Sequence, residues 1–255
     1  PARTNEIEYD GSSTVAWTID DVNGGEIVIG SGTNAATTKF SNFNNLIGGA
    51  GVDDFTVEST GSIDSINGTS AIGNSLRIVE TNALDSFNWV LDEFDTKGSV
   101  QNVDGFSNIQ ILHGSGAEDT LEARDVNNSW VISDNHAGAL NAIAFDGMEI
   151  LAGGSLADAF SINNDGDVVR IAGVASLASN TASWDTITVS TANDNVWQLN
   201  DEQLLESNVA YDNSTRDIDF VGIENLVGGV DADVFNFNDA NVIGSVSGVS
   251  GTNIY

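Results

Sequence analysis

The chain has 255 residues, 40% of them hydrophobic, so it is long and apolar enough to bury a core. Its 38 acidic and 7 basic residues give a net charge of −31, which excludes nucleic acid and anionic membranes as partners, because both require basic patches. The absence of Cys excludes disulfide and thiol chemistry, and no apolar run approaches the ~18 residues of a membrane-spanning helix.

Short segments that alternate apolar and polar residues recur along the chain. Examples in chain order are VAWTID at 15–20, DFTVE at 54–58, SLRIV at 75–79 and TITVS at 186–190. A period of two residues predicts β-strands, and Gly, Asn, Asp and Ser bound these segments as they bound strands. Only LDEFDTKGSV and NDEQLLESNV could hold a helical turn. The chain is therefore predicted to be all-β.

Four ungapped copies of one pattern begin at Phe40, Phe106, Phe145 and Phe220. Each copy has Leu six residues after this Phe, Gly eight residues after it and Asp thirteen residues after it. The repeated Leu and Gly are Leu46, Leu112, Leu151, Leu226, Gly48, Gly114, Gly153 and Gly228. A second motif precedes each copy and is centred on Trp17, Trp89, Trp130 or Trp197.

Fixed motifs joined by connections of varying length favour a stack of like units. Stacking in register would place Leu on Leu and Phe on Phe along an interior ladder, to which Leu226, Phe235 and Phe237 should belong. The near-absence of Pro suits strands that hydrogen-bond on both sides. We therefore predict a parallel β-helix, or β-solenoid, with a right-handed coil. At roughly 20–25 residues and about 4.8 Å per rung, it would have about ten to twelve rungs and a length on the order of 50 Å.

A single solenoid domain is expected over residues 1–255. Its four degenerate repeats should cover about residues 14–85, 86–126, 127–193 and 194–255. The final NVIGSVSG follows Phe237 as GSIDSING follows Val57. We therefore expect the chain to be a fragment or one module of a longer array.

The segments NVWQL, at Asn195–Leu199, and FVGIENLVGGVDADVF, at Phe220–Phe235, resemble repeats of large haemagglutinin-like and RTX-type surface adhesins of Gram-negative bacteria. The resemblance covers most of the chain through the four copies, although the second copy has Ser115 for the second Gly and Leu121 for Phe. It implies a parallel β-helix, export to the cell surface, and a role in adhesion, biofilm formation or fibre-like extension.

The Gly-Gly…Asp loops are candidate calcium sites. GGAGVDDFT, at Gly48–Thr56, matches the nonapeptide of calcium-binding β-rolls, in which oxygens from adjacent turns surround the ion. Because the copies are not in tandem, we favour a turn in which Gly adopts positive φ and Asp accepts hydrogen bonds from turn amides. The candidate calcium ligands are Asp53, Asp54, Asp119, Asp158, Asp165, Asp167, Asp231 and Asp233.

A polysaccharide lyase or hydrolase is an alternative, because parallel β-helices include such enzymes. However, the basic residues are scattered, and no pair of carboxylates stands out from the repeat as a glycosidase would require. His113 and His136 are expected at the surface. Four of the five Trp recur at one position, which favours core packing, and Trp184 lies outside it. We predict no catalytic residues.

The favoured function is a structural and adhesive module that forms a stiff acidic rod or fibre outside the cell, on a bacterial surface. Its expected partners are neighbouring repeats or like subunits, surface glycans, and host or matrix receptors. The alternatives are a calcium-stabilised adhesin module and a β-helical protein that binds or degrades polysaccharide.

Overall fold

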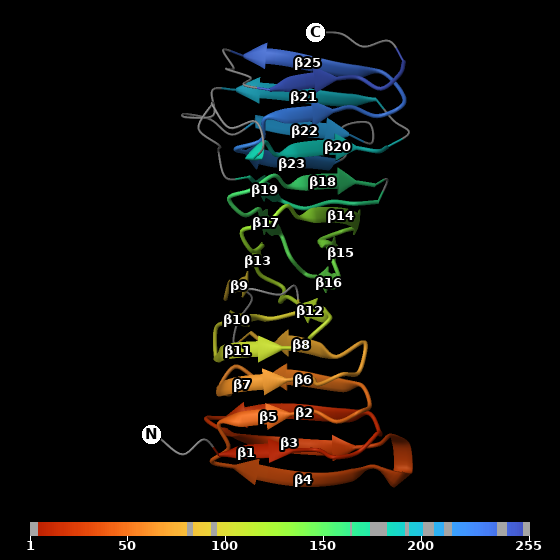
Figure 1. Ribbon diagram of the computed structural model, residues 1–255. Helices are drawn as coiled ribbons and strands as arrows, with labels where there is room; N and C mark the ends of the chain where they lie inside the picture. Colours follow the sequence, from red (N-terminus) through yellow and green to blue (C-terminus); the bar gives the residue numbers. More distant parts are fainter. Residues whose placement is uncertain are drawn as a thin grey trace. The chain divides into compact units, whose positions relative to one another are not determined.

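A computed structural model describes residues 5–80, 84–92, 96–163, 165–173, 183–191, 194–200, 207–211, 216–238 and 244–251. These residues form 26 β-strands and one 3₁₀ helix, so the all-β prediction is confirmed (Figure 1). No helix in these ranges is long and apolar enough to cross a membrane. The chain divides into two compact units, unit 1 with residues 1–119 and 142–147, and unit 2 with residues 120–141 and 148–255.

Unit 1 contains two sheets, named A1 and B1 here. In spatial order, the strands of sheet A1 are β1 (Glu6–Glu8), β5 (Asn45–Ile47), β7 (Ile63–Asn67), β11 (Val103–Ser107), β10 (Gly98–Val100) and β9 (Asn88–Leu91). Those of sheet B1 are β4 (Ala36–Ser41), β3 (Gly24–Ile29), β2 (Val15–Asp21), β6 (Asp53–Val57), β8 (Ser75–Ile78), β12 (Ile111–His113) and β16 (Ile143–Asp146). The 3₁₀ helix, Gly32–Asn34, lies between β3 and β4.

Unit 2 likewise contains two sheets, A2 and B2. In spatial order, the strands of sheet A2 are β13 (Thr120–Glu122), β17 (Ile150–Ala152), β19 (Arg170–Ala172), β23 (Arg216–Val221), β22 (Ser207–Tyr211), β21 (Asn195–Asn200) and β25 (Asp233–Asn238). Those of sheet B2 are β26 (Ser245–Ser247), β24 (Asn225–Val227), β20 (Thr186–Val189), β18 (Ala159–Ile162), β14 (Ser129–Asp134) and β15 (Ala137–Leu140).

Most neighbouring strands pair in parallel, and the chain alternates between the two sheets of a unit, as from β5 to β8 in unit 1. The exceptions are three antiparallel meanders, β2–β4, β9–β11 and β21–β23, and the antiparallel hairpin β14–β15. Each of these segments begins with the strand that carries the repeated Trp. The prediction of parallel strands is thus confirmed between these segments and wrong within them.

Tight turns cause the antiparallel exceptions. Asn23, between β2 and β3, has φ of 55°, and His136, between β14 and β15, has φ of 52°. Left-handed backbone of this kind matches the twist of a two-residue hairpin, and Asn followed by Gly is its strongest short-range signal. Asn23-Gly24 indicates a turn here, but the pair is displaced by one residue from that pattern, because Asn23 is the second loop residue and Gly24 already pairs with Asp21.

The parallel register stacks buried side chains in columns. One column in sheet B1 consists of Trp17, Phe55, Leu76, Leu112 and Phe145. The ring of Trp17 stacks on Phe55 with centroids 5.6 Å apart, and Trp130 stacks on Phe160 in sheet B2 at 5.4 Å. The expected ladder of Phe on Phe is therefore wrong in detail, because the register puts Trp on Phe.

The four repeated Leu and the four repeated Trp are all buried. Phe235 is buried as predicted, but Phe237 is 46% exposed, so its predicted place in the interior is wrong. Phe237 belongs to β25, the outermost strand of sheet A2, and its one paired neighbour there is Leu199 of β21. Phe235, on the same strand, stacks on Trp197 with ring centroids 5.4 Å apart, whereas Phe237 stands next to the last residue of β25.

Replacing Phe160 by Ala should lower the free energy of unfolding by about 3–5 kcal/mol, because the buried ring lies between Trp130 and Ile187 in its column. Phe160→Leu should cost clearly less, since the second repeat buries Leu121 at this position. Urea unfolding followed by Trp fluorescence tests both variants, with Ser161→Ala on the outer face of the same strand as the control. Equal losses for Ala and Leu would contradict the stacked column.

Candidate functional site

The repeated Asp is buried in all four copies and caps its own loop. Through Oδ2, Asp53 accepts the N–H of Gly49 at 2.9 Å, and Asp158 accepts that of Gly154 at 2.8 Å. The N–H of Ser115 donates to Asp119 Oδ2 at 2.5 Å, and that of Gly229 donates to Asp233 Oδ1 at 3.2 Å. In each copy the donor precedes the Asp by four residues, so the carboxylate holds the loop closed.

The first Gly of each loop leaves room for this carboxylate. A Cβ built on Gly48, Gly153 or Gly228 would lie only 2.2, 2.3 or 2.1 Å from an Oδ2 atom of the Asp of its own loop. None of the four repeated glycines has the positive φ that we expected from the sequence. That expectation is wrong, because the glycine is required by the close approach of the carboxylate and not by the backbone conformation.

The other carboxylate oxygen reaches the neighbouring strand. Asp158 Oδ1 accepts the backbone N–H of Asn128 at 3.0 Å, and the N–H of Asp158 in turn donates to Asp185 Oδ1 at 2.8 Å. The N–H of Asp185 then donates to Glu224 Oε2 at 2.8 Å. The four residues directly precede β14, β18, β20 and β24 of sheet B2. They are Asn128, Asp158, Asp185 and Glu224, and we call this arrangement the capping ladder.

A shorter ladder of the same kind exists in sheet B1. The N–H of Asp53 donates to Asn74 Oδ1 at 2.9 Å, and the N–H of Asn74 donates to Gln110 Oε1 at 3.0 Å. In addition, Trp17 Nε1 donates to Asp53 Oδ1 at 3.0 Å, which joins the repeated Trp to the repeated Asp.

Sequence reasoning missed the ladder residues that lie outside the Gly-Gly…Asp loops. They are Asn74, Gln110, Asn128, Asp185 and Glu224. A signal was present in the sequence, because each stands two residues before a buried apolar residue at the start of a strand, as in N-S-L, N-S-W and D-T-I. One polar residue at that offset is common in β-proteins, and only its recurrence along the chain is informative.

Burial raises the pKa of the carboxyl groups of Asp53, Asp158 and Asp233. Burial raises that of Asp158 to about 6, although hydrogen bonds from Asn128 and Gly154 act in the opposite direction. Burial also raises the pKa of Asp53 and Asp233 above the usual Asp value, against hydrogen bonds from Trp17 and Asn195 respectively. These three carboxyl groups therefore take up protons more readily in the folded chain than in the unfolded one.

The remaining candidate calcium ligands lie elsewhere. Asp54, Asp165 and Asp231 are exposed, and Asp167 is half-buried beside Tyr211. Asp54 accepts a hydrogen bond from Ser75 at 2.8 Å, and Asp165 lies 3.7 Å from Arg216. In the described ranges, no three acidic, His or Cys side chains come together as a metal site. Calcium binding at the eight Asp remains a prediction.

Each of the two histidines contacts a carboxylate of its own unit, and the two do not form a joint site. His113 Nδ1 lies 2.7 Å from Asp146 Oδ2 in unit 1, and His136 Nδ1 lies 2.8 Å from Glu149 Oε1 in unit 2. Both imidazoles are partly covered, with 22% and 29% of the side chain exposed.

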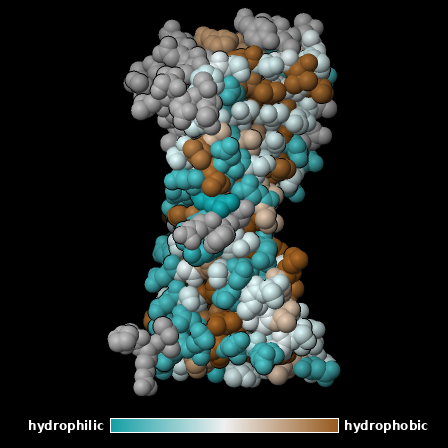
Figure 2. Space-filling model, viewed as in Figure 1, coloured by the Kyte–Doolittle hydropathy of each residue, from teal (hydrophilic) through white to brown (hydrophobic). Residues whose placement is uncertain are grey.

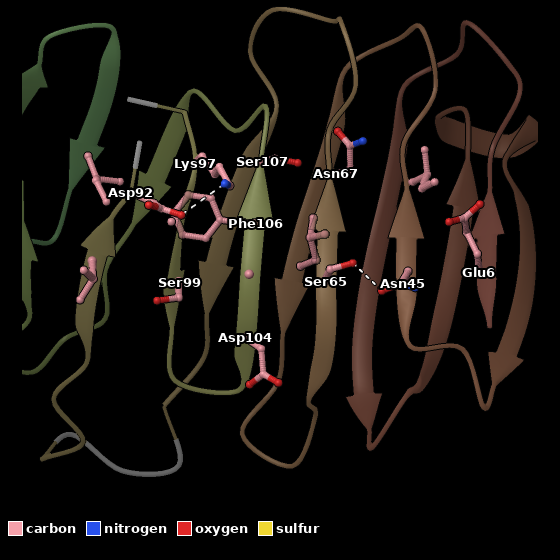
Figure 3. A pocket seen from close by; sticks show the side chains of 16 residues that line it. Glu6, Asn45, Ser65, Asn67, Asp92, Lys97, Ser99, Asp104, Phe106 and Ser107 are labelled. Carbon is pink, nitrogen blue, oxygen red and sulfur yellow. Dashed lines mark hydrogen bonds and ion pairs between the residues drawn. The ribbon is translucent and has the colours of Figure 1, made fainter. Parts of the chain in front are cut away.

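A hollow with a volume of about 670 Å³ lies on the outer face of sheet A1 (Figure 3). Its floor consists of small residues from four strands, namely Asn45, Ser65, Asn67, Ser99, Gly105 and Ser107, with the half-buried apolar residues Ile47 and Val90 beside them. Its rim carries Glu6, Asp104 and the ion pair between Asp92 and Lys97, whose charged atoms are 3.3 Å apart. We call this hollow the A1 groove.

The parallel register sets the rows of the A1 groove. Asn45, Ser65 and Gly105 stand side by side across β5, β7 and β11, and Asn67 stands beside Ser107. Ser65 Oγ donates to Asn45 Oδ1 at 2.6 Å (Figure 3). The result is a shallow face of neutral hydrogen-bonding groups and two apolar residues, Ile47 and Val90, within a rim that carries three acids and Lys97.

No protein-family model matches the chain, and no curated protein is similar to it in sequence. The resemblance to adhesin repeats therefore stays a prediction from the motifs alone.

Stability should rise as the pH falls from 7 to 5. Asp158 has a pKa of about 6 when folded and ~3.9 when unfolded, so in this range the folded state binds more protons. Its contribution is complete below the unfolded pKa and is lost as the pH rises through 6. Urea unfolding at several pH values in 1 M NaCl, which screens the net charge, should show a slope of up to about 1.4 kcal/mol per pH unit for this proton. Asp158→Asn should reduce the slope, and an unchanged slope would contradict the assignment.

Gly153→Ala should lower the free energy of unfolding by at least about 1–3 kcal/mol, because its Cβ would meet Asp158 Oδ2 at 2.3 Å and the buried carboxylate has nowhere to move. Gly105→Ala is the matched control, since its Cβ would meet no atom within 4 Å. Thermal and urea unfolding compare the two variants. Equal tolerance of both changes would show that the loop does not require glycine.

Proposed function

We propose that the chain is a structural and adhesive repeat module, a stiff acidic rod that extends from or assembles on a bacterial surface outside the cell. The observation that carries this proposal is the burial of the repeated positions. The repeated Trp, Leu, first Gly and Asp of the motif are all buried, and the repeat therefore specifies an interior. Repetition that builds an interior serves a scaffold, whereas an enzyme needs one site that differs from the rest of the chain.

The proposed rod is a β-solenoid with inserted meanders. Asn45 pairs with Ser65, and Asn225 pairs with Ser245, each pair being 20 residues apart in sequence. A step of this size between parallel neighbours, with one strand of the other sheet in between, is what a solenoid rung requires. The meanders add strands within one rung, and this accounts for the variable distance between the Trp motif and the Phe that follows it.

The hydrophilic, acidic surface favours a rod that does not associate with most other molecules. Hydrophilic residues prevail on the face seen in Figure 2, and hydrophobic ones form small groups there. Large apolar residues at the described surface are scattered along the sequence, namely Val22, Ile72, Leu84, Leu156, Val169, Val230, Phe237 and Val249. With a net charge of −31, like chains repel one another at low salt. The proposed partners are neighbouring repeats, glycans or matrix receptors, and no enzymatic activity is part of the proposal.

Negative-stain electron microscopy of the purified chain tests the proposed rod. We expect particles of uniform length on the order of 50 Å, as stacked strands about 4.8 Å apart would give. Phe160→Ala in 2–3 M urea provides the comparison, because loss of a stacked column should shorten or unfold the particles. Round or irregular particles of the unmodified chain would contradict the proposal.

A further inference from the structure

Gly105 lies at a β-bulge, because Asp104 and Gly105 stand opposite the single residue Ser99 of β10. Only a bulge with a left-handed residue requires glycine, and the backbone of Gly105 is not left-handed. Gly105 lies inside β11, where glycine destabilises a strand because it has no side chain to pack. Its φ is not positive, and a Cβ built on it would meet no atom within 4 Å. A strand glycine with neither requirement often marks a place where a ligand approaches the backbone closely.

Gly98, on the adjacent strand β10, shows the contrast. A Cβ on Gly98 would lie 2.3 Å from the carbonyl oxygen of Val90 and 2.9 Å from the ring of Phe106, so packing alone requires that glycine. Gly105 faces the opposite way, into the A1 groove. The open space above Gly105 therefore lies in a floor of Ser and Asn, beside the apolar residues Ile47 and Val90.

The floor offers hydrogen-bonding groups that the protein does not use. The hydroxyls of Ser99 and Ser107 make no side-chain hydrogen bond to any other described residue, and the amide nitrogen of Asn45 makes none either. Ser and Asn side chains both donate and accept, and this matches a ligand that also does both. Glu6 and Asp104 at the rim oppose an anion, while Lys97 is already paired with Asp92.

We propose that the A1 groove binds an uncharged or amino-sugar saccharide, which lies flat over Gly105 and exchanges hydrogen bonds with Asn45, Ser65, Ser99 and Ser107. A volume of about 670 Å³ is in the range of small-ligand sites. A peptide strand fits less well, because the groove lies on a sheet face and has no free backbone edge to pair with. A protein partner would need buried aromatic or Arg anchor points, which the floor does not offer.

This inference deepens the proposed adhesive function by naming a ligand class and a face, and it rests on that function only for its biological purpose. The two can fail separately. Elongated particles that bind no saccharide would support the proposed rod and contradict the proposed saccharide site. Saccharide binding by round particles would support the site and contradict the rod.

The experiment is a titration of the whole chain with three oligosaccharide probes, followed by isothermal calorimetry and by NMR shifts of backbone amides. The probes are cellotetraose, N-acetylated chitotetraose and an oligouronate. The first two are uncharged, the second being built from an N-acetylated amino sugar, and the third is acidic. We expect binding of cellotetraose or chitotetraose and none of the oligouronate, with the largest shifts at Gly105 and its neighbours.

Gly105→Val is the decisive variant. Val favours strands and its side chain meets open space, so the melting temperature should be unchanged or higher. The same side chain would fill the floor, and affinity for the bound probe should fall by at least about tenfold. Asn45→Ala should weaken binding through lost hydrogen bonds, and Thr56→Val, on the outer face of sheet B1, should leave it unchanged.

Three outcomes would overturn the proposal. They are binding of none of the neutral or amino-sugar probes, preference for the oligouronate, and a Gly105→Val variant that folds normally and binds as the parent does. Concentration-dependent self-association that Gly105→Val abolishes, without saccharide binding, would instead identify the groove as a contact between copies of the chain.

Discussion

The capping ladder is the interaction on which the rest of the structure depends. A strand that starts inside a protein presents a buried N–H, and leaving it without a partner costs about 1–3 kcal/mol. In sheet B2 the N–H groups of Asn128, Asp158 and Asp185 each donate to the side chain that precedes the next strand. The acceptors are Asp158, Asp185 and Glu224 respectively. Asp158 also holds its own loop closed, and its carboxylate leaves no room for a side chain at Gly153. One carboxylate therefore closes the loop, requires this glycine and sets the register of two neighbouring strands.

The sequence was most informative about the interior. Alternation with a period of two shows which residues share a face, and the four repeated Trp and four repeated Leu are buried accordingly. The period says nothing about where along a strand the buried stretch ends, and for this reason Phe237, near the end of β25, could not be distinguished from Phe235. The positive φ expected at the repeated glycines failed for a similar reason, since a contact with a side chain four or five residues away leaves no local signature.

The A1 groove could not be read from the sequence at all. Its floor joins residues from four strands, and Gly105 is unusual only in relation to what surrounds it in space. In sequence it is one glycine among 27. The ladder residues Asn74 and Gln110 are equally ordinary in sequence, and their role depends on strand order. The parallel register that aligns the buried columns also aligns the outer rows, so the core and the candidate binding face have the same cause.

The meanders have a mechanical consequence. Each full meander adds two strands to one sheet, or about 10 Å at the usual strand spacing, and acts as a wedge that would curve a stack toward the opposite sheet. In unit 1 one wedge, β2–β4, lies in sheet B1 and the other, β9–β11, lies in sheet A1. In the proposed solenoid, the two would act in opposite directions. The curvature of such a module is therefore decided by which sheet receives each insertion, so that loss or gain of a single hairpin could convert a straight element into a bent one without altering any repeat.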